Sequence, residues 1–95
     1  MRRIEFAELR GDPMLGGNTV RLFGRCYHGP IKIGDIFTEV KSGRGLEDVG
    51  MRVMAVIFKG DPVPEVVTGQ TGEIVLTGLG VETVTPGVRI SGKMF

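Results

Sequence analysis

Cysteine is nearly absent from the sequence, which excludes two common ways of stabilising a small protein. The only cysteine, Cys26, has no second thiol with which to form an internal disulfide or a zinc site. An ordinary hydrophobic core must therefore stabilise the fold, and a chain of 95 residues is long enough to form one. We predict that residues 1–95 form a single domain.

Long hydrophobic runs and an excess of one charge are also missing. No stretch reaches the roughly 20 apolar residues of a membrane-spanning helix, and the first residues lack the apolar segment of a signal peptide. These features predict a cytoplasmic protein. The net charge is only +1, from twelve basic and eleven acidic residues. The overall basic excess of many nucleic-acid-binding proteins is therefore absent, so composition gives such binding little support, although it does not exclude a local basic patch.

Motifs for catalysis and nucleotide binding are missing as well. No glycine-rich segment has the lysine of a phosphate-binding loop, so we interpret these glycines as turns and predict no nucleotide binding. His28, the only histidine, lies beside Gly29 and Pro30, where an exposed turn residue is the simpler interpretation. Cys26 has no base held in place by a third group, and we interpret it as a small buried hydrophobic residue. The carboxylates are scattered, so we predict no metal, no cofactor and no enzyme activity.

Glycine, in contrast, is abundant, at 16 of 95 residues against a usual share of about 7%. Glycine destabilises a helix interior by about 1 kcal/mol per residue, whereas tight turns use it because it accepts a positive φ. Short segments rich in alternating apolar or β-branched residues predict strands. They cover 3–9, 19–27, 36–40, 51–58, 73–77 and 88–91, and residues 41–45 read as a loop between two of them. We therefore predict an all-β protein, either a small barrel or a sandwich.

The alternation also predicts which side chains face the core. Between residues 19 and 27, Val20 and Leu22 should face inward, and Arg21, Phe23 and Arg25 outward. A register change of one residue would exchange the two faces of a strand. The predicted core residues are Ile4, Phe6, Val20, Leu22, Ile33, Val53, Ala55, Ile57, Ile74, Leu76 and Ile90.

Three glycine-containing segments carry a resemblance to a known family. They are 24–35 (GRCYHGPIKIGD), 69–78 (GQTGEIVLTG) and 84–90 (VTPGVRI). Their order and spacing resemble the second domain of translation elongation factors such as elongation factor Tu, over nearly the whole chain. The resemblance implies a closed antiparallel barrel of about six strands, of the translation-factor domain 2 type. In the first segment, Gly34 is expected to take a positive φ in a tight turn and Asp35 to hydrogen-bond the local backbone, while Ile31 and Ile33 pack into the barrel.

The same resemblance implies a binding module rather than an enzyme. The chain has no segment that matches the GTPase domain of these factors, so GTP hydrolysis is not implied. In the factors, the barrel also helps to hold the aminoacyl end of tRNA, through an acidic residue on the strand that matches 51–58. Our alignment places Val56 at that position, and no acid occurs between residues 51 and 58. That particular contact is therefore not expected here.

Two functions are compatible with these observations. The first is a binding module that contacts RNA or a ribosomal component, with Tyr27 and Phe37 as candidates for base stacking. The alternative is a protein-interaction or oligomeric assembly module with no nucleic-acid role, for which a surface of mixed charge is equally suited. The basic residues that would contact phosphate in the first case are Arg21, Arg25, Lys32, Lys41 and Arg44.

Overall fold

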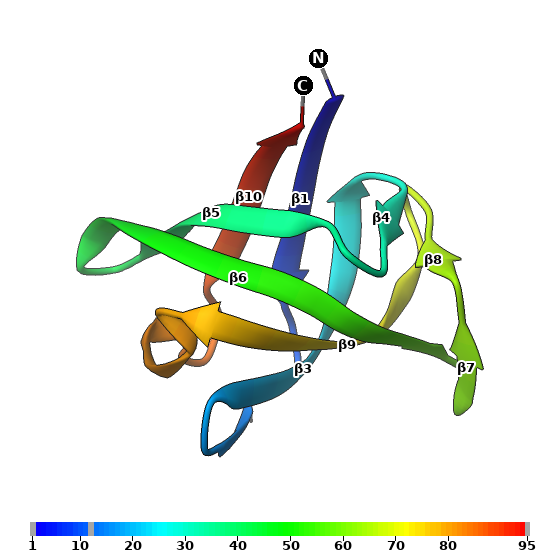
Figure 1. Ribbon diagram of the computed structural model, residues 1–95, viewed down its shortest axis with the longest axis horizontal. Helices are drawn as coiled ribbons and strands as arrows, with labels where there is room; N and C mark the ends of the chain where they lie inside the picture. Colours follow the sequence, from blue (N-terminus) through cyan, green and yellow to red (C-terminus); the bar gives the residue numbers. More distant parts are fainter. Residues whose placement is uncertain (1, 12, 95) are drawn as a thin grey trace.

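Six strands in the described part of the chain follow one another around a closed barrel (Figure 1). The computed structural model describes residues 2–11 and 13–94. In order around the ring, the strands are β1 (Arg2–Glu8), β10 (Arg89–Met94), β5 (Ile36–Ser42), β6 (Gly45–Phe58), β9 (Thr71–Leu79) and β3 (Thr19–His28). Antiparallel pairing of β3 with β1 closes the ring. The predicted fold class, a small closed antiparallel barrel, is confirmed.

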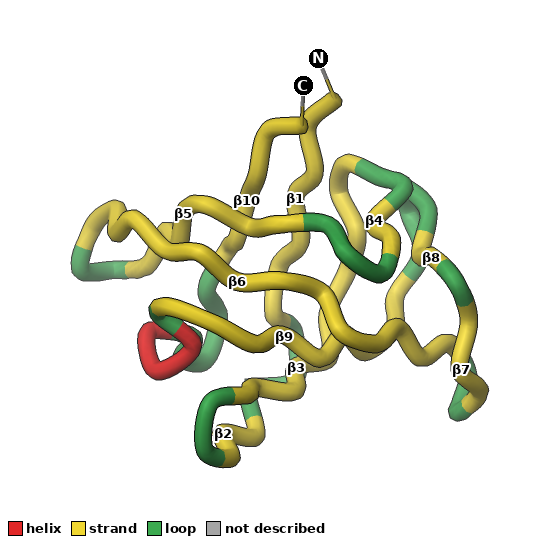
Figure 2. Tube along the Cα trace, viewed as in Figure 1, coloured by secondary structure: helices red, strands yellow, loops and turns green. Residues whose placement is uncertain are grey.

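Shorter elements surround the barrel. Strand β2 (Met14–Gly16) forms a hairpin with β3, and β7 (Asp61–Val63) forms one with β6. Strands β4 (Ile31–Lys32) and β8 (Glu65–Val66) make a separate two-stranded sheet. Among the described residues the only helical element is the 3₁₀ turn η1 (Val81–Thr83), which is far too short to span a bilayer (Figure 2). The prediction of a protein with almost no helix is therefore confirmed.

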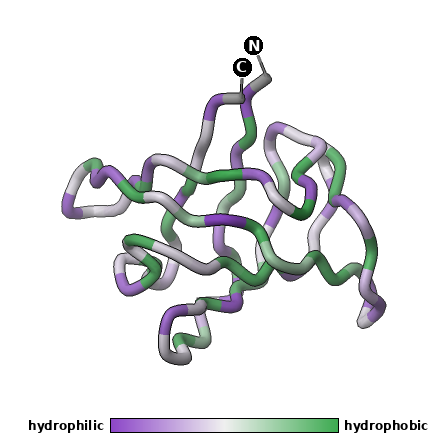
Figure 3. The backbone as a smooth tube through the Cα atoms, viewed as in Figure 1, coloured by the Kyte–Doolittle hydropathy of each residue, from purple (hydrophilic) through white to green (hydrophobic). Residues whose placement is uncertain are grey.

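The core lies inside the ring, and most of its members were predicted from alternation. Figure 3 shows polar and apolar residues alternating along β1, where Ile4 and Phe6 are fully buried. On β3, Val20 and Leu22 face inward, and Arg21 and Arg25 are exposed, as predicted. The predicted core residues that are buried are Ile4, Phe6, Val20, Leu22, Val53, Ile74, Leu76 and Ile90.

Two predicted core residues on β6, Ala55 and Ile57, are only partly buried, so this part of the prediction was wrong. The cause is a β-bulge at Met54. Val53 and Ala55 pair with successive residues of β9, so Met54 is an extra residue on its strand. A bulge changes which side chains face inward beyond it. Val53 and Val56 are therefore buried, and Ile57 lies on the outer face.

The turn that follows β4 confirms one prediction and corrects another. Gly34 has a φ of +96°, as the third residue of a type II turn requires. The N–H of Asp35 donates to the carbonyl of Lys32 (3.0 Å), and the N–H of Lys32 donates to the Asp35 carboxylate (2.9 Å). Ile31 is buried as expected, but Ile33 is 55% exposed because it occupies the tip of the turn.

Replacing Gly34 with valine should destabilise the fold by about 1–3 kcal/mol, the usual cost of a strained backbone conformation. The effect should be purely conformational, since a Cβ atom at this position would meet nothing within 4 Å. Asp35→Ala should cost about 1 kcal/mol, the value of one hydrogen bond. Thermal unfolding measures both. Gly43→Val is the control, because Gly43 is equally open but does not have a positive φ; equal melting temperatures for the two valine variants would contradict the assignment of this turn.

The segment 41–45 is a tight hairpin rather than the predicted open loop. Strand β5 continues to Ser42, β6 begins at Gly45, and these two residues pair with each other. Only Gly43 and Arg44 form the tip. The two cations of this segment, Lys41 and Arg44, therefore occupy a strand and a turn respectively.

Candidate functional site

A groove with a volume of about 250 Å³ lies on the outer face of β3, β9 and β6. Phe23, Glu73 and Ile57 pair in one row across these three strands. Because directly paired residues face the same side of a sheet, all three side chains lie on the face that carries the groove. The residues that line it are Arg10, Phe23, Ile57, Phe58, Lys59, Gly60, Thr71, Gly72 and Glu73. We call this cavity the Phe23–Phe58 groove.

Two irregular features of β6 shape one wall of the groove. The bulge at Met54 turns Ile57 outward. Phe58 pairs with Asp61 across a two-residue turn, in which Lys59 and Gly60 have φ values of +53° and +83°. Positive φ at both central residues is the signature of a type I′ hairpin turn, whose twist matches that of the strands it joins. This turn holds Phe58 and Lys59 at the edge of the groove.

Each phenylalanine of the groove has a cation over its ring. The Arg10 guanidinium lies 4.2 Å from the Phe23 ring centroid, and the Lys59 ammonium lies 5.4 Å from that of Phe58. The only carboxylate in the lining, Glu73, accepts a hydrogen bond from the Arg21 guanidinium. Within the described residues, neither Arg10 nor Lys59 forms an ion pair with a carboxylate. The groove therefore combines aromatic surface with uncompensated positive charge.

Two of the five predicted phosphate-binding residues, Arg25 and Lys41, lie in one row of paired residues around the barrel. Arg25 pairs with Ala7 on β1, Ala7 pairs with Arg89 on β10, and Arg89 pairs with Lys41 on β5. Arg25, Arg89 and Lys41 are exposed in one row that crosses four strands, and Ala7 between them is buried. Arg89, which was not among the predicted residues, connects Arg25 and Lys41 in this row.

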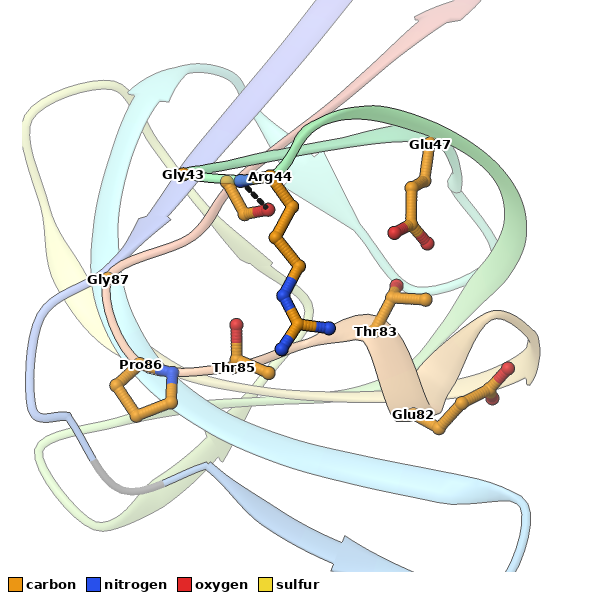
Figure 4. Close-up of a pocket in the computed structure, with 9 residues that line it drawn as sticks. Gly43, Arg44, Glu47, Glu82, Thr83, Thr85, Pro86 and Gly87 are labelled. Carbon is orange, nitrogen blue, oxygen red and sulfur yellow. Dashed lines mark hydrogen bonds between the residues drawn. The ribbon is translucent and has the colours of Figure 1, made fainter.

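The other three predicted cations lie apart from this row. Arg21 is neutralised by Glu73, and Lys32 is exposed on the small β4–β8 sheet. Arg44 extends into a pocket of about 410 Å³ between the β5–β6 turn and the segment that follows η1 (Figure 4). Glu47 and Glu82 line the same pocket, so its charge is mixed and it is less suited to phosphate than the smaller Phe23–Phe58 groove. The five predicted cations do not form one site.

The two aromatic stacking candidates, and the position that aligns with the acidic residue of the elongation factors, differ in their exposure to solvent. Tyr27 is 37% exposed, with the Arg89 guanidinium 4.7 Å from its ring centroid. Phe37 is fully buried in the core, so its suggested role in base stacking was wrong. Val56 is also buried. A side chain at that position points into the core rather than toward a ligand. His28 is exposed, as predicted.

Solved structures with a similar fold provide a comparison for this geometry. Translation elongation factor SelB from Methanococcus maripaludis matches 98% of this chain with a TM-score of 0.75 and 16% sequence identity, both in its apo form and in complex with the GTP analogue GppNHp. The barrel has a translation-factor fold. The chain spans 20% of the length of the SelB chain. No protein-family model matches the sequence, and no curated protein matches it.

The translation-factor resemblance predicted the barrel but not the groove. Phe58, Lys59 and Arg10 were missed because none of them belongs to the three glycine-containing segments. One local signal was present: a glycine after Lys59, between two strand-like segments, is typical of a two-residue hairpin. That signal could have placed Lys59 at a turn, but not opposite Phe23 on a different strand.

Cys26 is fully buried, as predicted, and its burial raises the pKa of its thiol from 9.0 to about 11. The unfolded chain therefore loses this proton at lower pH than the folded chain. Between pH 9 and pH 11 the unfolded state binds fewer protons, so the thiol's contribution to stability falls as the pH rises.

We expect the native thiol to resist alkylating reagents at neutral pH and to react after denaturation. We also expect the free energy of unfolding to fall more steeply between pH 9 and pH 11 for the natural chain than for Cys26→Ala. Comparing the two chains separates the thiol from other titrating groups. Rapid alkylation of the native protein would contradict the buried position.

Proposed function

We propose that the barrel is a non-catalytic RNA-contacting module of the translation-factor type, which binds an unpaired nucleotide in the Phe23–Phe58 groove. The observation that carries this proposal is the pair of aromatic rings, each with a cation within 6 Å of its centroid, around one groove. Proteins that bind single-stranded nucleic acid stack bases on aromatic rings, at about 1–3 kcal/mol per base, and place basic residues beside the phosphates.

The position of the groove is consistent with the translation-factor fold. In the elongation factors that the sequence resembles, the strand matching 51–58 is the one that helps to hold the aminoacyl end of tRNA. In this chain the end of that strand, Ile57 and Phe58, lines the groove. The aligned acidic position is the buried Val56. We therefore propose that an RNA strand is held here by stacking and phosphate contacts, without a carboxylate.

The backbone of Lys59 supports a functional role for its charge. A residue other than glycine in the left-handed region costs about 1–2 kcal/mol, and asparagine or glycine would suit this turn better. Lysine nevertheless occupies the position, with a φ of +53°. Strained residues cluster at functional sites, where the side chain is needed despite its cost.

Lys59→Asn tests the proposal because it removes the charge without adding strain. We expect it to leave the melting temperature unchanged or slightly raised and to weaken binding of an unstructured oligouridine. Loss of one phosphate contact should also reduce the dependence of log K on log salt by about 0.7, the value for single strands. Fluorescence anisotropy of labelled RNA over a range of salt concentrations measures both quantities.

Phe58→Leu tests the aromatic half of the groove, and we expect a loss of affinity of about tenfold, corresponding to one lost stacking contact. The control is the double change Lys41→Ala with Arg44→Ala, which removes two cations outside the groove. If the control variant loses RNA binding while Phe58→Leu and Lys59→Asn retain it, the RNA site lies at the β5–β6 hairpin and not in the groove. If the natural chain binds no RNA and captures a ribonuclease-resistant protein partner from a lysate, the protein-interaction function would replace this proposal.

A further inference from the structure

Two arginines lie beside the Tyr27 ring on the outer face of the barrel. The Arg25 and Arg89 guanidinium carbons lie 5.9 Å and 4.7 Å from its ring centroid. Arg89 is positioned in turn by Glu5, whose carboxylate lies 3.7 Å away and also accepts a hydrogen bond from Arg3 at 3.0 Å. The Glu5 side chain is only 12% exposed, while the Tyr27 residue is 37% exposed. The ring is therefore fixed in place by its neighbours and still accessible to a ligand.

Tyr27 lies on the same strand face as the proposed groove. Phe23 and Arg25 occupy alternate positions on β3, so their side chains project from one side of the strand. Tyr27 lies where the β1–β3 register shifts, and its ring stays on this side, 5.9 Å from the Arg25 guanidinium carbon. We call these three residues the β3 stripe. At about 3.3 Å per residue, its two aromatic residues are roughly 13 Å apart, with Arg25 midway between them.

This order matches the chemistry of an extended single strand of RNA, in which bases alternate with phosphates. Stacked bases in a duplex are only about 3.4 Å apart, so a strand that reaches both rings must be unstacked between them. Arg25 would then lie beside an intervening phosphate. Its partner on β9 is the neutral Thr71, and the nearby Glu5 is already engaged by Arg3 and Arg89. The β3 stripe is therefore electrostatically suited to an anionic backbone.

We propose that Tyr27 is a second stacking site, which binds another base of the RNA strand whose first base occupies the Phe23–Phe58 groove. The inference rests on the proposed function, because it requires the groove to bind the neighbouring part of the strand. It adds the direction of the strand across the barrel, from the groove along β3 toward Arg89. It also sets a minimum length for full affinity, since a single nucleotide cannot reach both rings.

The chain contains one tyrosine and no tryptophan, so its intrinsic emission reports on Tyr27 alone. The experiment titrates the full chain with oligouridine of about eight nucleotides, a length within the range bound by small barrels. Anisotropy of labelled RNA and emission of Tyr27 are followed in parallel. We expect RNA binding to quench the tyrosine emission at the same RNA concentrations at which anisotropy rises.

Variants separate this inference from the proposed function. Tyr27→Leu should bind the oligonucleotide about tenfold more weakly, whereas Tyr27→Phe should retain affinity and lose the emission signal. Arg52→Gln, which removes an exposed cation on β6, is the matched control and should bind as the natural chain does. The second site would be overturned, and the groove preserved, by the following result. Phe58→Leu weakens RNA binding, but Tyr27→Leu binds as tightly as the natural chain and RNA does not change the tyrosine emission. Absence of RNA binding to the natural chain would overturn both.

Discussion

Replacing Gly24 with alanine should destabilise the barrel by about 3 kcal/mol or more, at the top of the range for an overpacked interior. A Cβ atom added to Gly24 would lie 1.9 Å from the carbonyl oxygen of Ala7 and 2.6 Å from the ring of Phe6. A backbone oxygen cannot move aside as the end of a flexible side chain can. Strands β1 and β3 would therefore have to separate at the pairing that closes the ring. Equilibrium unfolding in urea, followed by circular dichroism, measures the loss.

Gly50→Ala is the matched control for this substitution. Gly50 also lies within a barrel strand, but its added Cβ would make only an ordinary contact, 4.0 Å from the Cβ of Leu79. Alanine at such a position reduces the conformational freedom of the unfolded chain and commonly stabilises a protein by about 0.4–1 kcal/mol. Equal destabilisation by the two substitutions would show that the close approach of β1 to Gly24 is not the cause.

Glu8→Ala should destabilise the fold by about 3 kcal/mol, because hydrogen bonds to a charged group contribute about 1.5–3 kcal/mol each. Glu8 is only 4% exposed. One of its carboxylate oxygens accepts the N–H of Gly11 at 2.7 Å, and the other accepts the N–H of Gly87 at 2.9 Å. A single side chain thus joins the segment after β1 to the loop before β10.

Glu8→Gln provides a graded comparison for the same contact. The glutamine oxygen can accept one of the two hydrogen bonds, but the amide nitrogen cannot accept the other. We expect Glu8→Gln to lower the free energy of unfolding, but by less than Glu8→Ala does. Hydrogen exchange should accelerate at the amides of Gly11 and Gly87 in the alanine variant. Unchanged exchange at both amides would show that the carboxylate does not hold these two loops together.

The strands and most of the core could be predicted from the sequence because alternation is a local property. Gly34 was placed correctly for the same reason, since a glycine before an aspartate marks a turn. The errors at Ala55 and Ile57 have a single cause, the bulge at Met54. No residue type in that strand predicts a bulge, because the extra residue is defined only by how β6 pairs with β9. Ile33 was misplaced because a turn tip interrupts the alternation that predicted its burial.

The candidate site was harder to predict than the fold because it is assembled across strands. Each cation could be recognised in the sequence, but not which ones share a surface. Arg21 is neutralised by a glutamate on another strand. Arg89 lies close to Tyr27 because their strands, β10 and β3, pair with opposite sides of β1. The Phe23–Phe58 groove likewise depends on the register of three strands. Sequence patterns describe one strand at a time and therefore cannot show these pairings.

The meeting of the first and last strands has a consequence for protein engineering. Arg2 pairs with Met94, so the chain enters and leaves the barrel at the same place (Figure 1). Such a unit can be spliced into a single surface loop of a host protein without forcing the host's flanking residues apart. A short linker could equally join residues 94 and 2, with new ends cut between Gly43 and Arg44 at the exposed hairpin tip. The resulting circular permutant would keep every strand pairing of the barrel. Its new ends would lie at the tip of the β5–β6 hairpin instead of beside the pair of Arg2 and Met94.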